Sequence, residues 1–258
     1  MHADKSGSNN YALLTPPPSQ RAGRYADGPG WNDFIGVYLR LSAVAVLLFA
    51  AGFGLAAAQD KINVGDLKVR AQAGEKAATR QLAEAYYLGR GGVEQNFKEA
   101  ARWYLALARQ GDARAQTSVG LMYARGHGVE KNLETARKWW SFAAAQNDPG
   151  AQYNLGLIYS QGEGVPQDPE QAVQWYTKAA ARGHVQAQHN LGMLYHEGKG
   201  VARDPVRAYF WVAVAARQGD EVARESLKTV SSGMSSGQIV EAEAQANEWM
   251  KKAKKILQ

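Results

Sequence analysis

The sequence contains no cysteine, and this absence excludes several classes of protein. A disulfide framework, a thiolate zinc site, a cysteine nucleophile and a cysteine-linked lipid anchor are all ruled out. A strong charge of one sign is also missing, because 30 basic residues face 24 acidic ones and leave a net charge of +6. We interpret this mild excess as a solvated surface and expect no nucleic-acid partner. The 258 residues are 45% hydrophobic, enough for one or two domains with a core.

Motifs of catalysis are lacking as well. No histidine takes part in an H-E-x-x-H arrangement, and His189 and His196, seven residues apart, have no third ligand beside them. The glycine-rich segments are not preceded by strands, so they do not predict a phosphate-binding loop. We therefore predict no catalytic residue, no cofactor and no metal site, and we expect that the protein is not an enzyme.

The chain has one long hydrophobic run. Residues 1–33 are rich in Gly, Ser, Asn and Pro and are predicted to be a disordered leader. Residues 34–58 follow as a signal peptide or a membrane anchor, since no charge interrupts Leu41 to Ala58. About 18 apolar residues are the lower limit for a spanning helix.

Two main interpretations of this run remain open. In the first, Arg40 is the positive end of a signal peptide that is cleaved near Ala58, which exports the protein to the periplasm or the medium. In the second, residues 41–58 stay as a single-pass anchor, with the rest of the chain outside the cytoplasm. A buried core helix is the third alternative. Membrane contact is expected only through 41–58, and only without cleavage.

The remainder of the chain repeats with a period of 36 residues. Four tyrosines and four tryptophans each recur at this spacing, and we predict that they form the core of the repeat: Tyr87, Tyr123, Tyr159 and Tyr195, with Trp103, Trp139, Trp175 and Trp211. A fixed period of this length indicates a solenoid. We predict an all-α fold, an α/α solenoid of four helix-turn-helix repeats followed by C-terminal capping helices.

The third unit shows how each repeat is built. Asp148 before Pro149 predicts the start of a first helix, and Gly162 and Gly164 predict its end. Asp168 before Pro169 predicts the second helix, whose apolar stripe includes Trp175. Neither helix buries its stripe alone, so each unit needs a neighbour. We expect Trp175 to fill the space between helices, and Trp175→Ala to cost about 3–5 kcal/mol.

This pattern resembles the Sel-one-like repeat family, α/α repeats related to tetratricopeptide repeats. The third unit carries it at Ala151, Leu155, Gly156, Tyr159, Gly162, Gly164, Val165, Asp168, Ala172, Trp175, Ala179, Ala180 and Gly183. The first unit departs from it, with Thr79, Glu84 and Arg90 at positions of Ala, Gly and Gly, which suggests a terminal repeat with one wet face.

These features divide the chain into segments. Residues 59–74 are expected to be a linker, 75–230 the repeat solenoid, and 231–258 a capping helix with Ser235 and Gln238 as its capping box.

The resemblance implies a non-enzymatic scaffold or adaptor of the bacterial envelope that binds a protein or peptide on a concave face lined by the first helices. Positions that vary there are candidate contacts, namely Ser118, Tyr153, Asn154, His189 and Asn190. The alternative is that they make ordinary polar contacts between repeats. A cell-wall-related enzyme or binder of β-lactam or peptidoglycan is the second function considered, although members linked with β-lactam binding are rich in cysteine. We expect a monomer.

Overall fold

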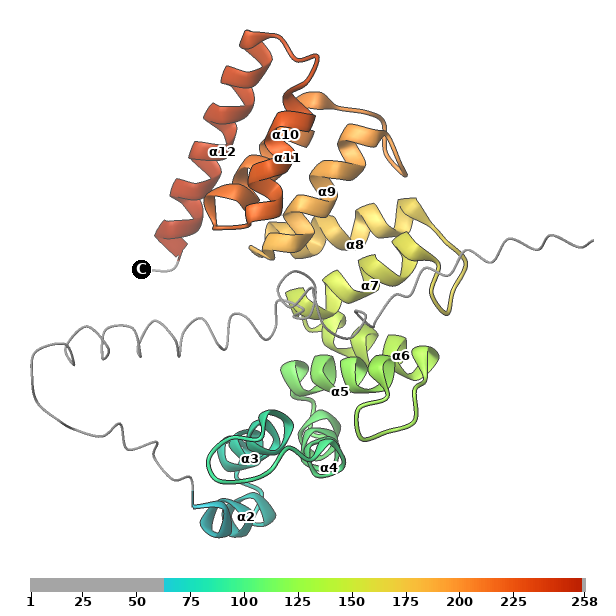
Figure 1. The fold of residues 1–258 in the computed structure, drawn as a ribbon, viewed down its shortest axis with the longest axis vertical. Helices are drawn as coiled ribbons and strands as arrows, with labels where there is room; N and C mark the ends of the chain where they lie inside the picture. The colour runs from blue at the N-terminus through green and yellow to red at the C-terminus, as the bar shows by residue number, and fades with distance from the viewer. Residues whose placement is uncertain (1–62, 257–258) are drawn as a thin grey trace, which may run out of the picture.

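A computed structural model describes residues 63–256 (Figure 1). All regular secondary structure among these residues is α-helical. The predicted leader at 1–33 and the hydrophobic segment at 34–58 lie outside the described residues. Between residues 63 and 256, no helix combines the length and the apolar character needed to cross a membrane.

The helices alternate as first and second members of hairpins that follow one another along a curved path (Figure 1). The first helices of the four units are α3 (Lys76–Leu88), α5 (Ala113–Arg125), α7 (Pro149–Gln161) and α9 (Val185–Glu197). The second helices are α4 (Phe97–Arg109), α6 (Leu133–Ala145), α8 (Pro169–Ala181) and α10 (Pro205–Arg217). Helix α2 (Val64–Gln72) precedes them, and α11 (Glu221–Ser231) and α12 (Ser236–Ile256) follow. The predicted all-α solenoid is confirmed.

The same capping chemistry recurs in each unit. Asp168 accepts a hydrogen bond from the backbone N–H of Gln171 at the start of α8, and Asn or Asp takes this place in the other second helices. Each first helix ends at a glycine in the left-handed conformation, such as Gly162 with φ 75°. A side chain there would be strained, so the glycines fix where the hairpin turns.

The first unit is displaced by one residue from the others in its first helix. Helix α3 begins 37 residues before α5, whereas α4 begins 36 before α6, because the intervening loop holds one extra residue. The carbonyl of Tyr86 accepts from the N–H of Asn96 at 2.8 Å, as the carbonyl of Tyr123 accepts from Asn132 at 2.9 Å. The counterpart of Tyr123 is therefore Tyr86, and the assignment of Tyr87 to this position was wrong.

With this shift of one residue, other residues of the first unit correspond to the repeat positions than we expected. Ala78 occupies the repeat alanine position, Ala83 stands at the helical glycine position, and Gly89 is the first loop glycine. Thr79 and Glu84 each follow these repeat positions by one residue, so neither marks an atypical repeat.

The enclosed side chain of each second helix lies one residue beyond the repeated tryptophan, and it is aromatic in the first three hairpins. Trp103 is buried, but Trp139, Trp175 and Trp211 are only partly buried. The fully enclosed positions are instead Tyr104, Trp140, Tyr176 and Val212. The expectation that Trp175 fills the space between helices was therefore wrong, and its ring instead lies 4.2 Å from the Nζ atom of Lys178.

A helical glycine makes room for the enclosed side chain. A Cβ atom on Gly156 would lie 2.5 Å from the ring of Tyr176, and one on Gly120 would lie 2.4 Å from Trp140. Real Cβ atoms do not approach so closely, so the glycine is required by packing although it weakens the helix. This contact joins the two helices of one hairpin.

Helix α2 lies inside the segment that we expected to be a linker. Leu67 and Ala71 of this helix are buried in the same cluster as Ala78 of α3. The expected wet face of the first unit is therefore covered, and the linker assignment for 59–74 was wrong over the nine residues of α2.

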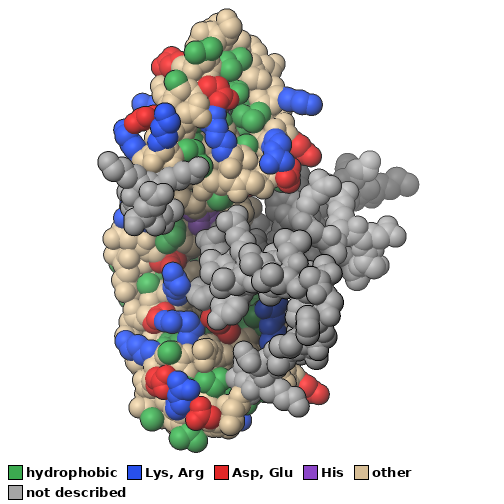
Figure 2. Space-filling model, turned by 90° about the vertical axis from the view of Figure 1, so that its left-hand side faces the viewer, with side chains coloured by type: hydrophobic (Ala, Val, Ile, Leu, Met, Phe, Trp, Pro, Cys, Tyr) green, Lys and Arg blue, Asp and Glu red, His purple; other side chains and the backbone are tan. Residues whose placement is uncertain are grey.

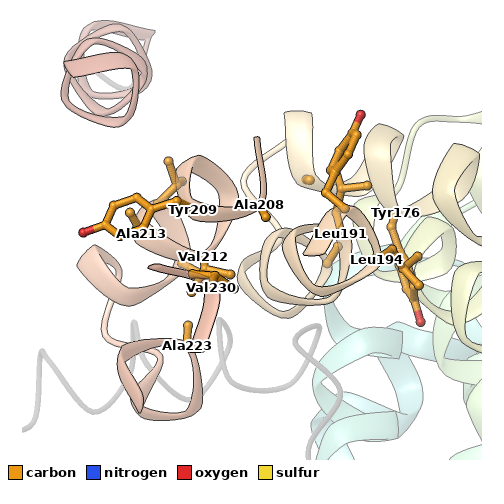
Figure 3. Close-up of a cluster of buried hydrophobic side chains, with 14 of the residues drawn as sticks. Tyr176, Leu191, Leu194, Ala208, Tyr209, Val212, Ala213, Ala223 and Val230 are labelled. Atoms are coloured by element: carbon orange, nitrogen blue, oxygen red, sulfur yellow. The ribbon is translucent and has the colours of Figure 1, made fainter. Parts of the chain in front are cut away.

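The C-terminal end of the solenoid is covered by a different arrangement of helices from the N-terminal end. Helix α11 is a first helix without a second, and α12 packs against α10, where the hydroxyl of Tyr209 donates to Glu243 at 2.7 Å. The predicted capping box is present, because Ser235 and Gln238 exchange hydrogen bonds. Figure 3 shows Tyr209, Val212 and Val230 in the hydrophobic cluster that unites these helices.

Buried glutamines connect successive hairpins. The side-chain amides of Gln116, Gln152 and Gln188 donate to the carbonyls of Ala108, Ala144 and Ala180 at the end of the preceding second helix. The Oε1 atoms of Gln116 and Gln188 accept from Gln146 and Gln218. The equivalent position beside Gln152 is Arg182, and Gln152 Oε1 has no hydrogen-bond partner among the described residues.

Candidate partner-binding surface

The first helices carry a row of partly exposed polar side chains at equivalent positions. The row comprises Ser118 of α5, Asn154 of α7 and Asn190 of α9, and it continues to Ser226 of α11. Each stands at the sixth residue of its helix, so the stacking of the hairpins aligns them along the solenoid. We call this row and its flanking positions the first-helix face.

The members of this row differ in whether their side-chain polar atoms already make hydrogen bonds within the protein. The hydroxyl of Ser118 donates to the carbonyl of Arg114 in its own helix at 3.0 Å. Asn190 and Ser160 both hydrogen-bond with the hydroxyl of Tyr176. Asn154 makes no side-chain hydrogen bond to any residue between 63 and 256, so its amide is available to a partner.

The adjacent positions join one repeat to the next. Thr117 donates to Asp148, the N-cap of α7, at 2.9 Å. Tyr153 stacks on His184, the N-cap of α9, with ring centroids 4.4 Å apart. His189 lies 3.0 Å from the hydroxyl of Ser226. Of the predicted contacts, Tyr153 and His189 are therefore engaged in junctions between repeats, as the alternative interpretation expected.

His184 replaces the aspartate that caps α5, α7 and α11. Its Nδ1 atom accepts from the backbone N–H of Ala187 at 3.1 Å, so the ring is neutral at this atom. Burial lowers the pKa of His184 to about 3, and burial likewise lowers the pKa of His189. Both rings therefore act as neutral packing and hydrogen-bonding groups at physiological pH.

The described surface carries two clefts and side chains of both charges. Residues 63–256 hold no group of three or more His, Asp or Glu side chains placed to bind a metal ion. Two surface clefts, of about 580 and 460 Å³, are lined by basic, polar and one methionine side chains, with no carboxylate among them. On the described part of the face in Figure 2, basic and acidic side chains are interspersed and hydrophobic ones form only small groups.

Comparison with known proteins agrees with the repeat boundaries. A model of the Sel1 repeat matches residues 76–112, 113–148, 149–184 and 185–220. The first match is one residue longer than the others, in accord with the extra loop residue of the first unit. Among curated proteins, none matches the chain significantly.

Two solved structures resemble the chain at more than 30% sequence identity. One is c5321, a protective antigen of uropathogenic Escherichia coli with an SLR fold, at 34% identity and a TM-score of 0.68 over 73% of this chain. The other is a Sel1 repeat protein from Oxalobacter formigenes, at 37% identity and a TM-score of 0.58 over 65% of this chain. The chain spans only 40% and 48% of the length of these two proteins.

Proposed function

The chain belongs to the Sel1 repeat family, whose members generally mediate protein–protein interactions, and from this premise we propose that it is a non-enzymatic scaffold that binds a protein partner on its first-helix face. The observation that carries the proposal is the aligned polar row of Ser118, Asn154 and Asn190. Its amides suit an extended peptide, whose backbone N–H and C=O groups need partners at regular intervals.

The proposal is tested by removing the amides from this row. In the variant Asn154→Ala with Asn190→Ala, we expect loss of the partner that the native protein retains on co-purification from its own cells. The matched control is Gln174→Ala with Asn247→Ala, because both side chains are exposed and lie on α8 and α12, away from the row. Far-UV circular dichroism and the melting temperature verify that both variants fold. Equal retention of the partner by both variants would contradict the proposal.

We further propose that the solenoid acts outside the cytoplasm. The support comes from the uncharged run Leu41 to Ala58, which ends in three alanines suited to signal peptidase. The intact mass of the protein, measured in soluble and membrane fractions of its own cells, tests this. A soluble species that begins at Gln59 indicates a free exported scaffold, and a membrane species that retains 41–58 indicates a tethered one. A full-length species in the cytoplasmic fraction would contradict export.

A further inference from the structure

A cleft of about 580 Å³ lies at the C-terminal end of the first-helix face. It is lined by His196 near the end of α9, Arg203 of the α9–α10 loop, Lys228 and Thr229 of α11, and Ser232. Thr229 lies three residues after Ser226, the last member of the polar row, and therefore on the same side of α11, so the cleft adjoins the first-helix face.

The cleft exists because the repeat array stops after a first helix. Lys228 takes the place that Gly192 holds in the fourth unit, where a Cβ atom would lie 2.7 Å from Val212 of the second helix. After α11 the chain crosses to pack α12 on α10, so α11 has no second helix of its own. A long basic side chain therefore occupies a position that holds glycine in the second, third and fourth units and alanine in the first.

The charges around the cleft are unbalanced. The ionisable side chains that line it are His196, Arg203 and Lys228, and the hydroxyls of Thr229 and Ser232 add hydrogen-bond donors. Of the acidic groups nearby, Glu197 binds Lys199 at 2.7 Å and Asp204 binds Arg207 at 3.4 Å. Glu225 stands three residues before Lys228 on α11 and does not line the cleft. Basic groups and hydroxyls that converge without a carboxylate favour a ligand with negative charge.

We propose that this cleft binds the carboxylates of an acidic segment in the protein partner. Arg203 would hold a carboxylate through its planar guanidinium, and Lys228 would contribute a second charge-assisted hydrogen bond from the opposite side. The inference rests on the proposed function, because it assigns a charge preference to one end of the partner-binding face. Asn154 and Asn190 then contact the backbone of the partner, and the cleft selects its sequence.

The test uses full-length protein and a fluorescein-labelled hexaglutamate peptide, with binding followed by fluorescence anisotropy. Arg203→Gln with Lys228→Gln removes both cations, neither of which makes a salt bridge within residues 63–256. Lys98→Gln with Arg109→Gln is the matched control, because it removes the same charge from exposed positions on α4. We expect the first variant to weaken binding about tenfold, and the control less than about twofold.

Two results would overturn the inference. The first is that the native protein does not bind hexaglutamate. The second is that both double variants weaken binding equally, because binding would then depend on net charge and not on the cleft. The proposed function is judged separately, through partner retention in the Asn154→Ala with Asn190→Ala variant. If that retention depends on the asparagines but not on Arg203 and Lys228, the cleft proposal fails and the scaffold function stands.

Discussion

Adding a single methyl group to Gly156 should destabilise the protein, although alanine is the better helix former. A Cβ atom at this position would lie 2.5 Å from two ring carbons of Tyr176, whose side chain is 1% exposed and has no room to move. Overpacking of this kind costs about 1–3 kcal/mol, and the gain in helix propensity returns about 1 kcal/mol. We expect Gly156→Ala to lower the free energy of unfolding by up to about 2 kcal/mol.

The sign of this effect should reverse once the ring is removed. Tyr176→Ala by itself should cost about 3–5 kcal/mol, because it deletes an enclosed aromatic side chain. In that background Gly156→Ala meets no ring, so it should stabilise the helix by about 1 kcal/mol. The coupling between the two sites is then about 1–3 kcal/mol, above the value for independent positions.

Urea unfolding followed by far-UV circular dichroism measures all four proteins of this cycle. The slope of the transition is compared as well, because a solenoid can lose its repeats separately. Gly237→Ala serves as the control, since a Cβ atom there would meet nothing closer than 3.9 Å, and it should be neutral or stabilising. If Gly156→Ala stabilises the native protein as Gly237→Ala does, the packing of Tyr176 against α7 is refuted.

Three further substitutions test other parts of the fold. Arg182→Gln removes the exposed hydrogen bond from Arg182 to Asn147 but lets a glutamine donate to the buried, unpaired Oε1 of Gln152. We expect the buried gain to be larger and the free energy of unfolding to rise by up to about 1 kcal/mol, and a lowered urea midpoint would contradict this. Trp175→Ala should cost about half as much as Tyr176→Ala or less, since Trp175 is only partly buried, and equal midpoints would speak against the corrected register. His184 has its pKa lowered to about 3 by burial, so between that value and its ordinary 6.5 the unfolded chain binds a proton that the folded chain does not. The native protein should therefore lose stability from pH 7 to pH 5, by up to about 1.4 kcal/mol per pH unit, and His184→Asp should lose less; parallel melting temperatures for the two proteins would exclude this role.

The solenoid class and the helix boundaries could be predicted because their signals are local. Asp168 before Pro169 and the glycine at 162 act through the backbone of a few neighbouring residues, and helix α8 begins where they indicate. Repetition strengthens such signals, since the same cap occurs once in every unit.

The register of the first unit was misread for a physical reason. An extra loop residue shifts α3 but leaves α4 in step, so Trp103 still obeys the period of 36 while the tyrosine does not. Tyr86 and Tyr87 are adjacent, and a tyrosine is therefore found in either register. The hydrogen bond from Asn96 to the carbonyl of Tyr86 decides between them, and no composition pattern contains that information.

The same ambiguity hid the enclosed aromatic residues. Trp175 and Tyr176 are neighbours, as are Trp139 and Trp140, and helical periodicity alone does not select one of two consecutive apolar positions. The choice depends on which of them meets the helical glycine of the facing helix. The cleft near Lys228 also escaped the sequence, because it depends on α12 crossing to α10 in place of forming a fifth hairpin.

The sequence indicated the first-helix face, but it did not show which of its residues join successive repeats and which remain candidates for partner contact. Ser118, Asn154 and Asn190 keep one period and remain candidates for partner contact. Tyr153 and His189 lie on the same helices, yet Tyr153 stacks on the N-cap of α9 and His189 meets Ser226 in the second turn of α11. That distinction arises from the stacking of whole hairpins, which a pattern within one repeat does not describe.

Site-specific photocrosslinking in living cells tests the central claim most directly. A photoreactive phenylalanine analogue is introduced at Asn154 on the first-helix face, and in a second strain at Gln174 on the exposed side of α8. Our account predicts a discrete crosslinked protein from position 154 and none from position 174. Crosslinking of the same protein from both positions, or from position 174 alone, would contradict binding through the first-helix face.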